Sequence, residues 1–422
     1  MEATRIRLAE GVHLTYLPAR KFKTSLLSAQ FVTPLRRETA GANALLAAVL
    51  RRGTVSCPDM GALSAKMDNL YDASIDYTVR KKGENQCVGF VASFIDDCYA
   101  PAGERLLEPV AGLLGELICD PVTYHGRFVP EYFESEKTNL LEAIRSLIND
   151  KRDWADSRLL RALCDGEAYA VPRLGDEETV DKLQALKVYT QYRDLISTAP
   201  LEIIYSGSAD LERVKQALAA AFATLPREEV RVISTAAPHV CRESVQYVED
   251  VLDVTQGKLG MGFSCGSDDM PALLMGNTLF GGSSNSKLFL NVREKLSLCY
   301  YASSLYHRQK GLITVSSGIE FQNYQRAYDE IMAQLEAVQK GELEDWELEG
   351  ARSTLLNSYA TVGDSQGKLE NFYLGQAATG QHETPADLAR AIQDMTAERI
   401  CRAMSTVKLD TVYFLKGKEA EA

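Results

Sequence analysis

The residues best suited to hold a catalytic metal are scarce and widely spaced in this chain. Its five histidines are His13, His125, His239, His307 and His382, and no two of them fall within one helix length of each other. The chain therefore contains neither H-E-x-x-H nor H-x-x-E-H, the patterns that bind catalytic zinc from one helix. The closest cysteines, at positions 87 and 98, do not form a C-x-x-C hook. These spacings argue against a histidine or cysteine metal site within the chain.

Ser264 is the candidate nucleophile that lies in a catalytic motif. Gly262-Phe263-Ser264-Cys265-Gly266 matches the G-x-S-x-G nucleophile elbow after an expected strand at Gly257–Phe263. The elbow should lead directly into a helix, whereas Ser267–Pro271 resembles a loop followed by a helix start. Because motifs this short often match by chance, a strand end with a capped turn is favoured. A serine hydrolase stays a minor alternative.

A glycine- and serine-rich loop at Gly281–Lys287 precedes another expected helix, Ser286–Glu294. The N-terminus of a helix can bind an anion, but this loop does not match G-x-x-x-x-G-K-[ST]. A capped loop is therefore favoured over a nucleotide site.

The composition describes an ordinary globular protein of 422 residues with an acidic charge balance. Lys+Arg number 46 against 58 Asp+Glu, a formal net charge of −12, so nothing draws the whole chain toward nucleic acid or anionic lipid. The N-terminal Met-Glu-Ala-Thr-Arg-Ile lacks the apolar run of a secretion signal, and apolar stretches such as Ala44–Leu50 are too short to span a bilayer. The nine irregularly spaced cysteines fit a reducing compartment. We expect a cytoplasmic protein whose partners include neither nucleic acid nor a membrane.

Strand-like and helix-like segments alternate along the chain, which predicts an α+β or α/β architecture. A long helical stretch is expected from Phe133 to about Cys164, and the apolar period is lost between Pro226 and Glu243. This loss indicates a linker at 226–244 between two domains, 1–225 and 245–422.

The order of elements restarts after the linker. Tyr71-Asp72-Ala73-Ser74 opens an expected hairpin in the first half, and Tyr300-Tyr301-Ala302-Ser303 opens one in the second. A polar turn follows each at a similar distance, Arg80-Lys81-Lys82-Gly83 and Arg308-Gln309-Lys310-Gly311. The shared order predicts two related domains produced by internal duplication.

Two segments carry a resemblance to the M16 family (insulinase, pitrilysin and mitochondrial processing peptidase). The first is Asn43–Thr54, a helix with a Gly-Thr ending; the second is Lys287–Ala302, which resembles the family's second-domain motif with Arg293 and, seven residues later, Tyr300. The resemblance covers essentially the whole chain. It implies two mainly antiparallel sheets packed by helices, with Arg293 and Tyr300 binding substrate.

The first motif departs from the family where the metal should bind. Aligning on Gly53-Thr54 places Ala44 and Ala48 at the two histidine ligands and Ala47 at the general-base glutamate. The third ligand position corresponds to Ala143, with Glu142 as its neighbour. An alanine methyl group offers no lone pair to zinc and accepts no proton from water. We therefore expect no metal or other cofactor here and no peptidase activity from the chain alone.

The resemblance implies a division of labour with another chain. Arg293 and Tyr300 can hydrogen-bond a peptide carbonyl and stabilise negative charge that develops on it. The leading hypothesis is a non-catalytic subunit that binds peptide and completes the active site of an H-x-x-E-H-bearing, zinc-holding M16 partner. A pure scaffold or binding protein is the alternative. Whether the isolated chain forms a homodimer stays open.

Overall fold

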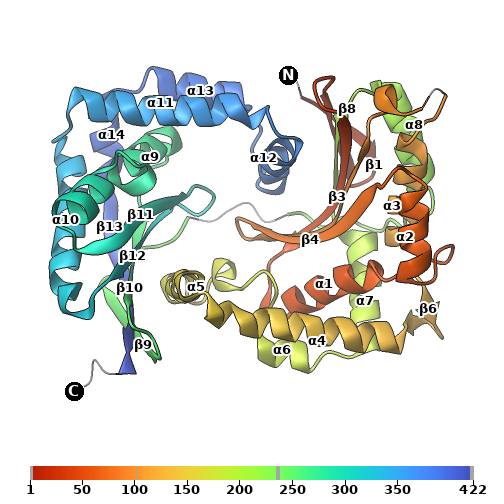
Figure 1. Ribbon diagram of the computed structural model, residues 1–422, viewed down its shortest axis with the longest axis horizontal. Coiled ribbons are helices and arrows are strands. Elements are labelled where there is room, and N and C mark those ends of the chain that lie inside the picture. The colour runs from red at the N-terminus through yellow and green to blue at the C-terminus, as the bar shows by residue number, and fades with distance from the viewer. Residues whose placement is uncertain (1–2, 102, 234–237, 419–422) are drawn as a thin grey trace. The chain divides into compact units, whose positions relative to one another are not determined.

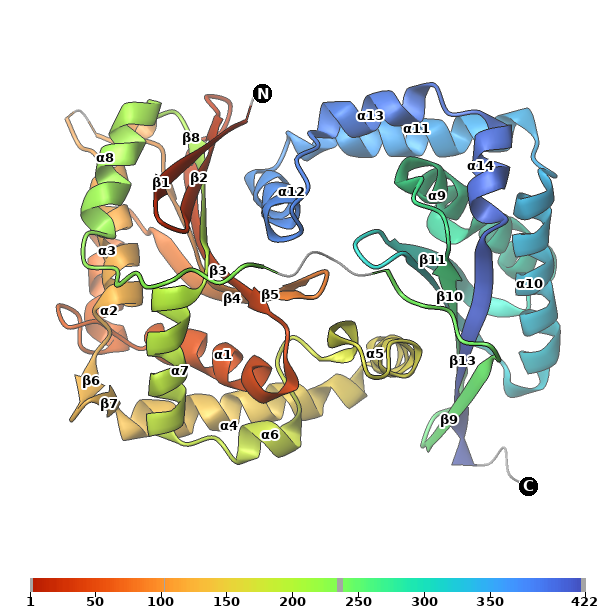
Figure 2. The same cartoon turned by 180° about the vertical axis from the view of Figure 1, so that it is seen from behind.

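The computed structural model describes residues 3–101, 103–233 and 238–418, and the chain divides into two compact units. Unit 1 comprises Met1–Arg145, Val171–Thr235 and Gly363–His382; unit 2 comprises Ser146–Ala170, Ala236–Val362 and Glu383–Ala422. Figures 1 and 2 show that each unit is a sheet flanked by helices.

Unit 1 contains a six-stranded sheet in the order β1-β2-β8-β3-β5-β4. Only the β2–β8 pair is parallel; all other neighbours are antiparallel. The strands are β1 (Thr4–Ala9), β2 (Val12–Pro18), β3 (Thr24–Pro34), β4 (Ser74–Lys82), β5 (Asn85–Ile95) and β8 (Leu201–Gly207). The edge strand β4 borders the candidate site described below.

Helices α1 (Arg37–Leu50), α3 (Leu107–Cys119) and α7 (Ala185–Thr198) contact strands β3, β4 and β5 of this sheet. Helix α12 (Gln366–Ala378) packs on strands β3 and β8. Helix α1 is buried along its whole length from Ala40 to Leu50, so it forms the centre of the unit 1 core. The other helices of unit 1 are α2 (Met60–Asp68), α4 (Pro130–Ser146), α6 (Glu177–Asp181) and α8 (Leu211–Ala221). A short hairpin, β6 (Thr123–Tyr124) with β7 (Arg127–Phe128), precedes α4.

Unit 2 contains a five-stranded sheet in the order β11-β12-β10-β13-β9, in which only β13 and β9 are parallel. The strands are β9 (Gln246–Leu252), β10 (Gly257–Cys265), β11 (Cys299–His307), β12 (Leu312–Ile319) and β13 (Val407–Gly417). The helices are α5 (Lys151–Leu163), α9 (Met270–Asn277), α10 (Tyr324–Lys340), α11 (Asp345–Val362), α13 (Pro385–Gln393) and α14 (Ala397–Met404).

The two sheets repeat one topology. Reading unit 1 from β4 gives β4-β5-β3-β8-β2, and reading unit 2 gives β11-β12-β10-β13-β9, with the single parallel pair at the same place. The predicted repeat segments lead into the equivalent edge strands β4 and β11. The expectation of two related α+β units with mainly antiparallel sheets is confirmed.

Each unit includes one helix from the other half of the chain. Helix α12 lies on β3 and β8 of unit 1, and α5 lies on the equivalent strands β10 and β13 of unit 2. The units therefore interleave along the chain, unlike the contiguous division into 1–225 and 245–422 expected from the sequence. Within the expected linker, Arg227 donates to the backbone oxygens of Ile196 and Ala199 in unit 1, while residues 234–237 lie outside the described residues.

The helical stretch expected from Phe133 to about Cys164 consists of two helices joined by a short turn. Helix α4 ends at Ser146, a 3₁₀ turn follows, and α5 begins at Lys151. The side chain of Asp150 accepts hydrogen bonds from the backbone N–H groups of Arg152 and Asp153, at 2.9 and 3.0 Å. This cap begins a new helix because it satisfies donors that a continuous helix would use internally.

Glycine allows α5 to lie close to the unit 2 sheet. A Cβ atom at Gly262 would come within 2.7 Å of Leu163 Cδ2, whereas one at Gly266 would meet nothing closer than 3.4 Å. We expect Gly262→Val to destabilise unit 2 by about 2 kcal/mol through overpacking, and Gly266→Val to cost much less. Denaturant unfolding followed by tryptophan fluorescence measures this, since both tryptophans, Trp154 and Trp346, belong to unit 2. Equal effects of the two substitutions would contradict the close-approach explanation.

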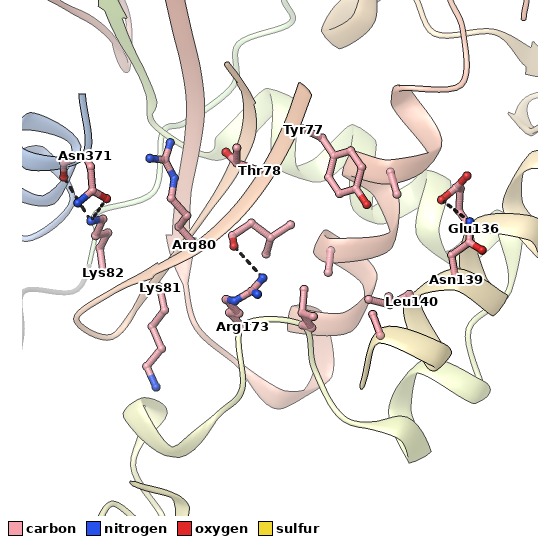
Figure 3. Close-up of a pocket in the computed structure, with 15 residues that line it drawn as sticks. Tyr77, Thr78, Arg80, Lys81, Lys82, Glu136, Asn139, Leu140, Arg173 and Asn371 are labelled. Carbon is pink, nitrogen blue, oxygen red and sulfur yellow. Dashed lines mark hydrogen bonds between the residues drawn. The ribbon is translucent and has the colours of Figure 1, made fainter. Parts of the chain in front are cut away.

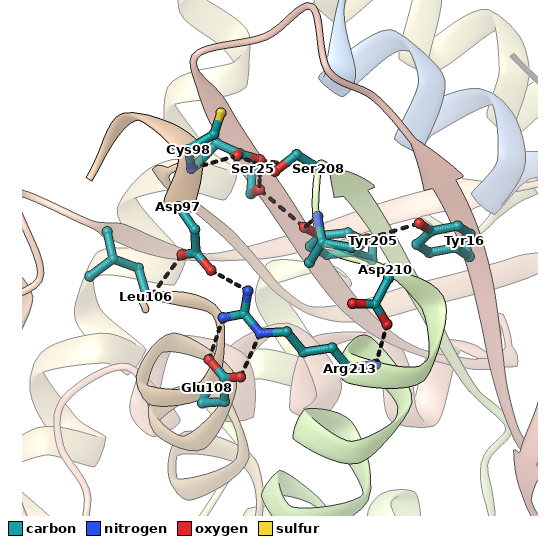
Figure 4. Close-up of polar contacts among 12 residues, drawn as sticks. Tyr16, Ser25, Asp97, Cys98, Leu106, Glu108, Tyr205, Ser208, Asp210 and Arg213 are labelled. Carbon is teal, nitrogen blue, oxygen red and sulfur yellow. Dashed lines mark hydrogen bonds and ion pairs between the residues drawn. The ribbon is translucent and has the colours of Figure 1, made fainter. Parts of the chain in front are cut away.

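A polar network ties α3 and α8 together in unit 1 (Figure 4). The guanidinium of Arg213 donates to Glu108 at 2.7 and 2.6 Å and pairs with Asp97 at 2.5 Å. Hydrogen bonding from Arg213 holds the pKa of Glu108 below its ordinary value. These contacts attach α3, and the segment at Asp97 that precedes it, to helix α8.

Candidate functional site

A cavity of about 770 Å³ lies within unit 1. It is lined by α1, α4, the edge strand β4, the loop at Arg173 and Leu174, and Asn371 of α12 (Figure 3). The edge strand contributes every residue from Tyr77 to Lys82. The cavity therefore combines helix side chains with a sheet edge that no further strand covers among the described residues.

The three alanines aligned with the metal ligands converge on this cavity. Ala44 and Ala48 line it from α1, where residues four apart share one helix face, and Ala143 lines it from α4. Glu142 is not among the lining residues. The fold thus brings together positions that are about a hundred residues apart in the sequence, and it supports Ala143 rather than Glu142 as the third position.

The cavity does not fit a zinc ion. Among the described residues that line it there is no histidine or cysteine, and its carboxylate, Glu136, is 9% exposed and already accepts a hydrogen bond from Arg52 at 2.9 Å and from Asn139 at 3.2 Å. Catalytic zinc needs three protein ligands and an open position for water. The alanine methyls supply none of these ligands.

Ala47, the position of the general base, lies elsewhere. It packs with Phe31, Leu50 and Val88 between α1 and the sheet, and it is 1% exposed. Its methyl group therefore contributes to the apolar core.

Basic side chains gather along β4 on the rim of the cavity. Arg80 makes two hydrogen bonds of 2.6 Å to Glu370 of α12. Lys82 donates to the side-chain and backbone oxygens of Asn371, at 2.6 and 3.2 Å. Arg173 donates to the backbone oxygen of Val79 at 3.2 Å. Burial lowers the pKa of Lys82 because it penalises the charged ammonium.

The predicted substrate residues Arg293 and Tyr300 lie in unit 2 on two irregular stretches of backbone. Arg293 belongs to a π-helix, η5 (Leu288–Lys295), and its guanidinium lies 4.7 Å from the ring centre of Phe289. Tyr300 is the extra residue of a β-bulge, because Cys299 pairs with Ile319 and Tyr301 with Gly318. Both π-helices and bulges are frequent at functional sites, where they redirect a side chain.

The bulge leaves the Tyr300 side chain accessible. Tyr300 is 62% exposed, and its hydroxyl donates a hydrogen bond to Glu320 at 2.8 Å. This hydrogen bond raises the pKa of Tyr300, because it stabilises the protonated phenol. No sequence pattern signalled the bulge or the π-helix.

The structure does not form a nucleophile elbow at Ser264. The residue lies inside β10, is 5% exposed, and pairs with Leu312 of β12 and Lys408 of β13. Helix α9 begins only at Met270. A strand-to-helix turn that would present the serine is therefore missing from this part of the chain. Lys287, at the end of the glycine-serine loop, forms a buried ion pair with Glu347 at 3.0 Å.

A second group of ligand-type residues meets in unit 2. Atoms of Cys164, Glu167 and His239 lie within 4.8 Å of one another. His239 already contacts the carboxylates of Glu167 and, at 3.2 Å, Asp410, while Glu167 also pairs with the ammonium group of Lys310. The ammonium supplies the positive charge that a metal would bring, so we assign this group a structural role.

None of the helices in the described residues combines the length and apolar character needed to cross a bilayer.

Comparison with known proteins identifies the family of this chain. Residues 182–355 match the family model described as "Peptidase M16 inactive domain". The chain is 34% identical over 416 residues, 97% of this chain and 96% of the relative, to a Bacillus subtilis (strain 168) protein named "Probable inactive metalloprotease YmfF".

Solved structures share the fold. A conserved protein from Enterococcus faecalis V583 superposes with a TM-score of 0.90 at 27% identity over 99% of both chains. A peptidase M16 inactive domain from Pseudomonas fluorescens shares the fold, with a TM-score of 0.79 at 18% identity over 99% of this chain and 98% of that one.

The duplicated α+β units, with alanines at the positions of the metal ligands, are those of an inactive peptidase homologue. The chain belongs to the M16 peptidase family, as a member without the H-x-x-E-H motif.

Proposed function

We propose that this protein is the non-catalytic subunit of a two-chain M16 peptidase. In this proposal it binds peptide and supplies Arg293 and Tyr300 to the active site of a partner that carries H-x-x-E-H and the zinc ion. The zinc resides only in the partner, and the assembly works in the cytoplasm. The observation that carries the proposal is the convergence of Ala44, Ala48 and Ala143 on one cavity, because the fold is kept while its metal ligands are gone.

The side chains in unit 2 support a role in proteolysis. Arg293 has 40% of its side chain exposed and contacts Glu294 at 3.5 Å, a weak surface pair. Tyr300 presents an exposed hydroxyl on the edge strand β11, and its hydrogen would turn from Glu320 to the substrate. A guanidinium and a phenol are both donors, so together they can stabilise the oxyanion that forms when water attacks a peptide carbonyl.

The edge strand β4 supports peptide binding. It is the last strand of its sheet, so its outer backbone groups have no partner strand among the described residues. Peptides commonly bind by adding a strand to such an edge. A second candidate function is a scaffold without any role in proteolysis, which would use the same sheet edges for protein contacts. It gives no function to the Arg293 and Tyr300 side chains.

Reconstitution with an H-x-x-E-H partner tests the proposal. The natural candidate is an M16 chain of similar length encoded by a neighbouring gene. We expect this protein alone to bind no stoichiometric zinc and to cleave no peptide, and the mixture with the partner to cleave. Arg293→Ala or Tyr300→Phe in this chain should lower kcat/KM of the mixture roughly 100-fold, because each substitution removes a donor to the oxyanion.

Matched controls are available in unit 2. Lys295→Ala changes a cation on the same π-helix, and Tyr247→Phe changes a tyrosine of β9 that is 61% exposed; both should leave activity unchanged. Size-exclusion chromatography checks that every variant still forms the complex with the partner. It also checks that each variant alone elutes at the same apparent mass as the parent, whether that is a monomer or a homodimer. A complex that retains full activity with Arg293→Ala and Tyr300→Phe combined would favour the scaffold function.

A further inference from the structure

We propose that two arginine side chains close the outer edge of β4, and that a polypeptide pairs with this edge only after displacing them. The two arginine caps are Arg51, the residue that follows helix α1, and Arg173, in the loop before α6. The inference rests on the peptide-binding part of the proposed function and adds its regulation, an autoinhibitory contact within unit 1. It follows from the register of β4, from the contacts of the caps and from the way they are held.

The pairing of β4 with β5 determines which backbone groups face outward. A two-residue turn, Gly83-Glu84, joins the strands, so Lys82 and Asn85 form the hydrogen-bonded pair next to it. In an antiparallel ladder, such pairs alternate with pairs whose N–H and C=O groups point away from the partner strand. Positions 75, 77, 79 and 81 of β4 therefore turn their backbone groups to the outer edge.

Two of these four outward carbonyl groups are already occupied. Arg51 donates through Nε to the backbone oxygen of Ile75 at 2.5 Å. Arg173 donates through Nη1 to the backbone oxygen of Val79 at 3.2 Å, the contact drawn as a dashed line beside Arg173 in Figure 3. A strand added at this edge would use both oxygens as acceptors and would need the space that the two guanidinium groups fill.

The backbone that carries Arg173 is fixed in place. Its carbonyl oxygen accepts a 2.6 Å hydrogen bond from the buried side-chain amide of Gln86. The N–H of Gly175 closes the turn onto the oxygen of Pro172 at 3.0 Å. Gly175 has a φ of 77°, and a Cβ atom on it would approach the backbone of Gly41 to 2.7 Å. The edge therefore opens by rotation of the Arg173 side chain and not by retreat of the loop.

The caps are contacts that can be given up. Arg51 is the C-cap of α1, and partial burial lowers the pKa of its guanidinium because burial penalises the charged form. Return of this group to water would offset part of the hydrogen bond that it loses. In the described part of the chain, neither cap forms an ion pair that would hold it on the strand.

Closure of this kind has a physical purpose at a sheet edge. Unpaired edges invite pairing with any extended chain, and charged side chains at the edge prevent it. Here the charged groups lie on the acceptors themselves. A net hydrogen bond changes an equilibrium constant about fivefold, so two caps hold the affinity for polypeptide roughly twentyfold below that of an open edge.

Binding of an unfolded polypeptide to the purified full chain tests the inference. The probe is fluorescein-labelled α-lactalbumin, reduced and alkylated with iodoacetamide so that it stays unfolded, at about 0.5 M salt to screen the charges that the substitutions remove. Fluorescence anisotropy should show Arg51→Ala and Arg173→Ala each binding about fivefold more tightly than the parent, and the double variant roughly twentyfold. Arg145→Ala removes an exposed arginine of α4 that does not line the cavity, and it should bind as the parent does.

A proline substitution locates the gain. Proline at position 77 removes an outward N–H and leaves the hydrogen bonds between β4 and β5 in place. Added to the double variant, Tyr77→Pro should abolish the gain in affinity, whereas Tyr77→Ala should retain it. Circular dichroism checks that each variant is folded.

The outcomes separate the closure from peptide binding itself. If the parent binds the probe and the double variant binds no more tightly, the closure is overturned and peptide binding stands. A gain that survives Tyr77→Pro would lie away from this edge and would also overturn the closure. Binding by none of the variants would overturn peptide binding at β4 as well, and reconstituted activity that still depends on Arg293 would then show that the partner alone holds the substrate.

Discussion

The triple variant Ala44→His, Ala48→His, Ala143→Glu is expected to bind one zinc ion per chain, with a dissociation constant below about 1 µM, whereas the parent binds none. The two histidines would project from one face of α1, four residues apart, and the glutamate from α4, all into the same cavity. Three protein ligands are the complement of a catalytic zinc site. The 770 Å³ cavity leaves room for the larger side chains.

The affinity follows from the number of ligands. A micromolar dissociation constant corresponds to about 8 kcal/mol, which is less than structural zinc sites reach with four ligands. Zinc bound after dialysis is measured by inductively coupled plasma mass spectrometry, and its affinity by competition with a chromogenic chelator.

The double variant Ala44→His, Ala48→His is the matched control, because it has the native Glu142 but no glutamate at position 143. We expect it to bind zinc at least tenfold more weakly than the triple variant, since Glu142 is not among the cavity-lining residues. Equal affinity would mean that Glu142 reaches the metal and that the third position has been assigned to the wrong residue. A triple variant that is folded by circular dichroism and binds no zinc would contradict the convergence of the three positions.

Glu370→Ala is expected to destabilise unit 1 by about 3–5 kcal/mol, the cost of leaving one member of a buried ion pair without its partner. Glu370 is 3% exposed and receives two hydrogen bonds from Arg80 and one of 2.7 Å from Ser28. These contacts join α12 to β3 and β4. Losing them leaves the Arg80 guanidinium partly buried and without its counter-charge.

The location of the tryptophans makes the effect specific to one unit. Trp154 and Trp346 both lie in unit 2, so fluorescence follows unit 2, while far-UV circular dichroism follows the helices and strands of both units. In urea, Glu370→Ala should move the circular dichroism transition of unit 1 to lower concentration and change the fluorescence transition less. Asp364→Ala, which removes an exposed pair with Lys21, should cost less than about 1 kcal/mol. Equal costs for Glu370 and Asp364 would show that the α12 contacts do not depend on the buried pair.

The sequence predicted the elements whose signals are local. Alternating apolar residues and the polar turn between β4 and β5 placed that hairpin within a few residues, and the Tyr-x-Ala-Ser repeat predicted the duplication. The expected helical stretch divides at Asp150, a residue type that favours N-caps over helix interiors, and its cap contacts mark where α5 begins. The sequence did not predict that α5 belongs to unit 2 and α12 to unit 1. The spacing of apolar residues indicates that a helix has an apolar face, but it does not indicate which sheet that face packs against.

By itself, the sequence determined what this protein lacks. Without histidine or glutamate at positions 44, 47, 48 and 143, the family's zinc chemistry has no donor atoms, whatever the fold. Only the tertiary structure decided what those positions form instead. Residues distant in the chain meet because α1, α4 and β4 pack around one cavity, and its charge arises where β4, α12 and the Arg173 loop come together. Charge and shape at such a place depend on contacts between segments far apart in sequence, which no local pattern encodes.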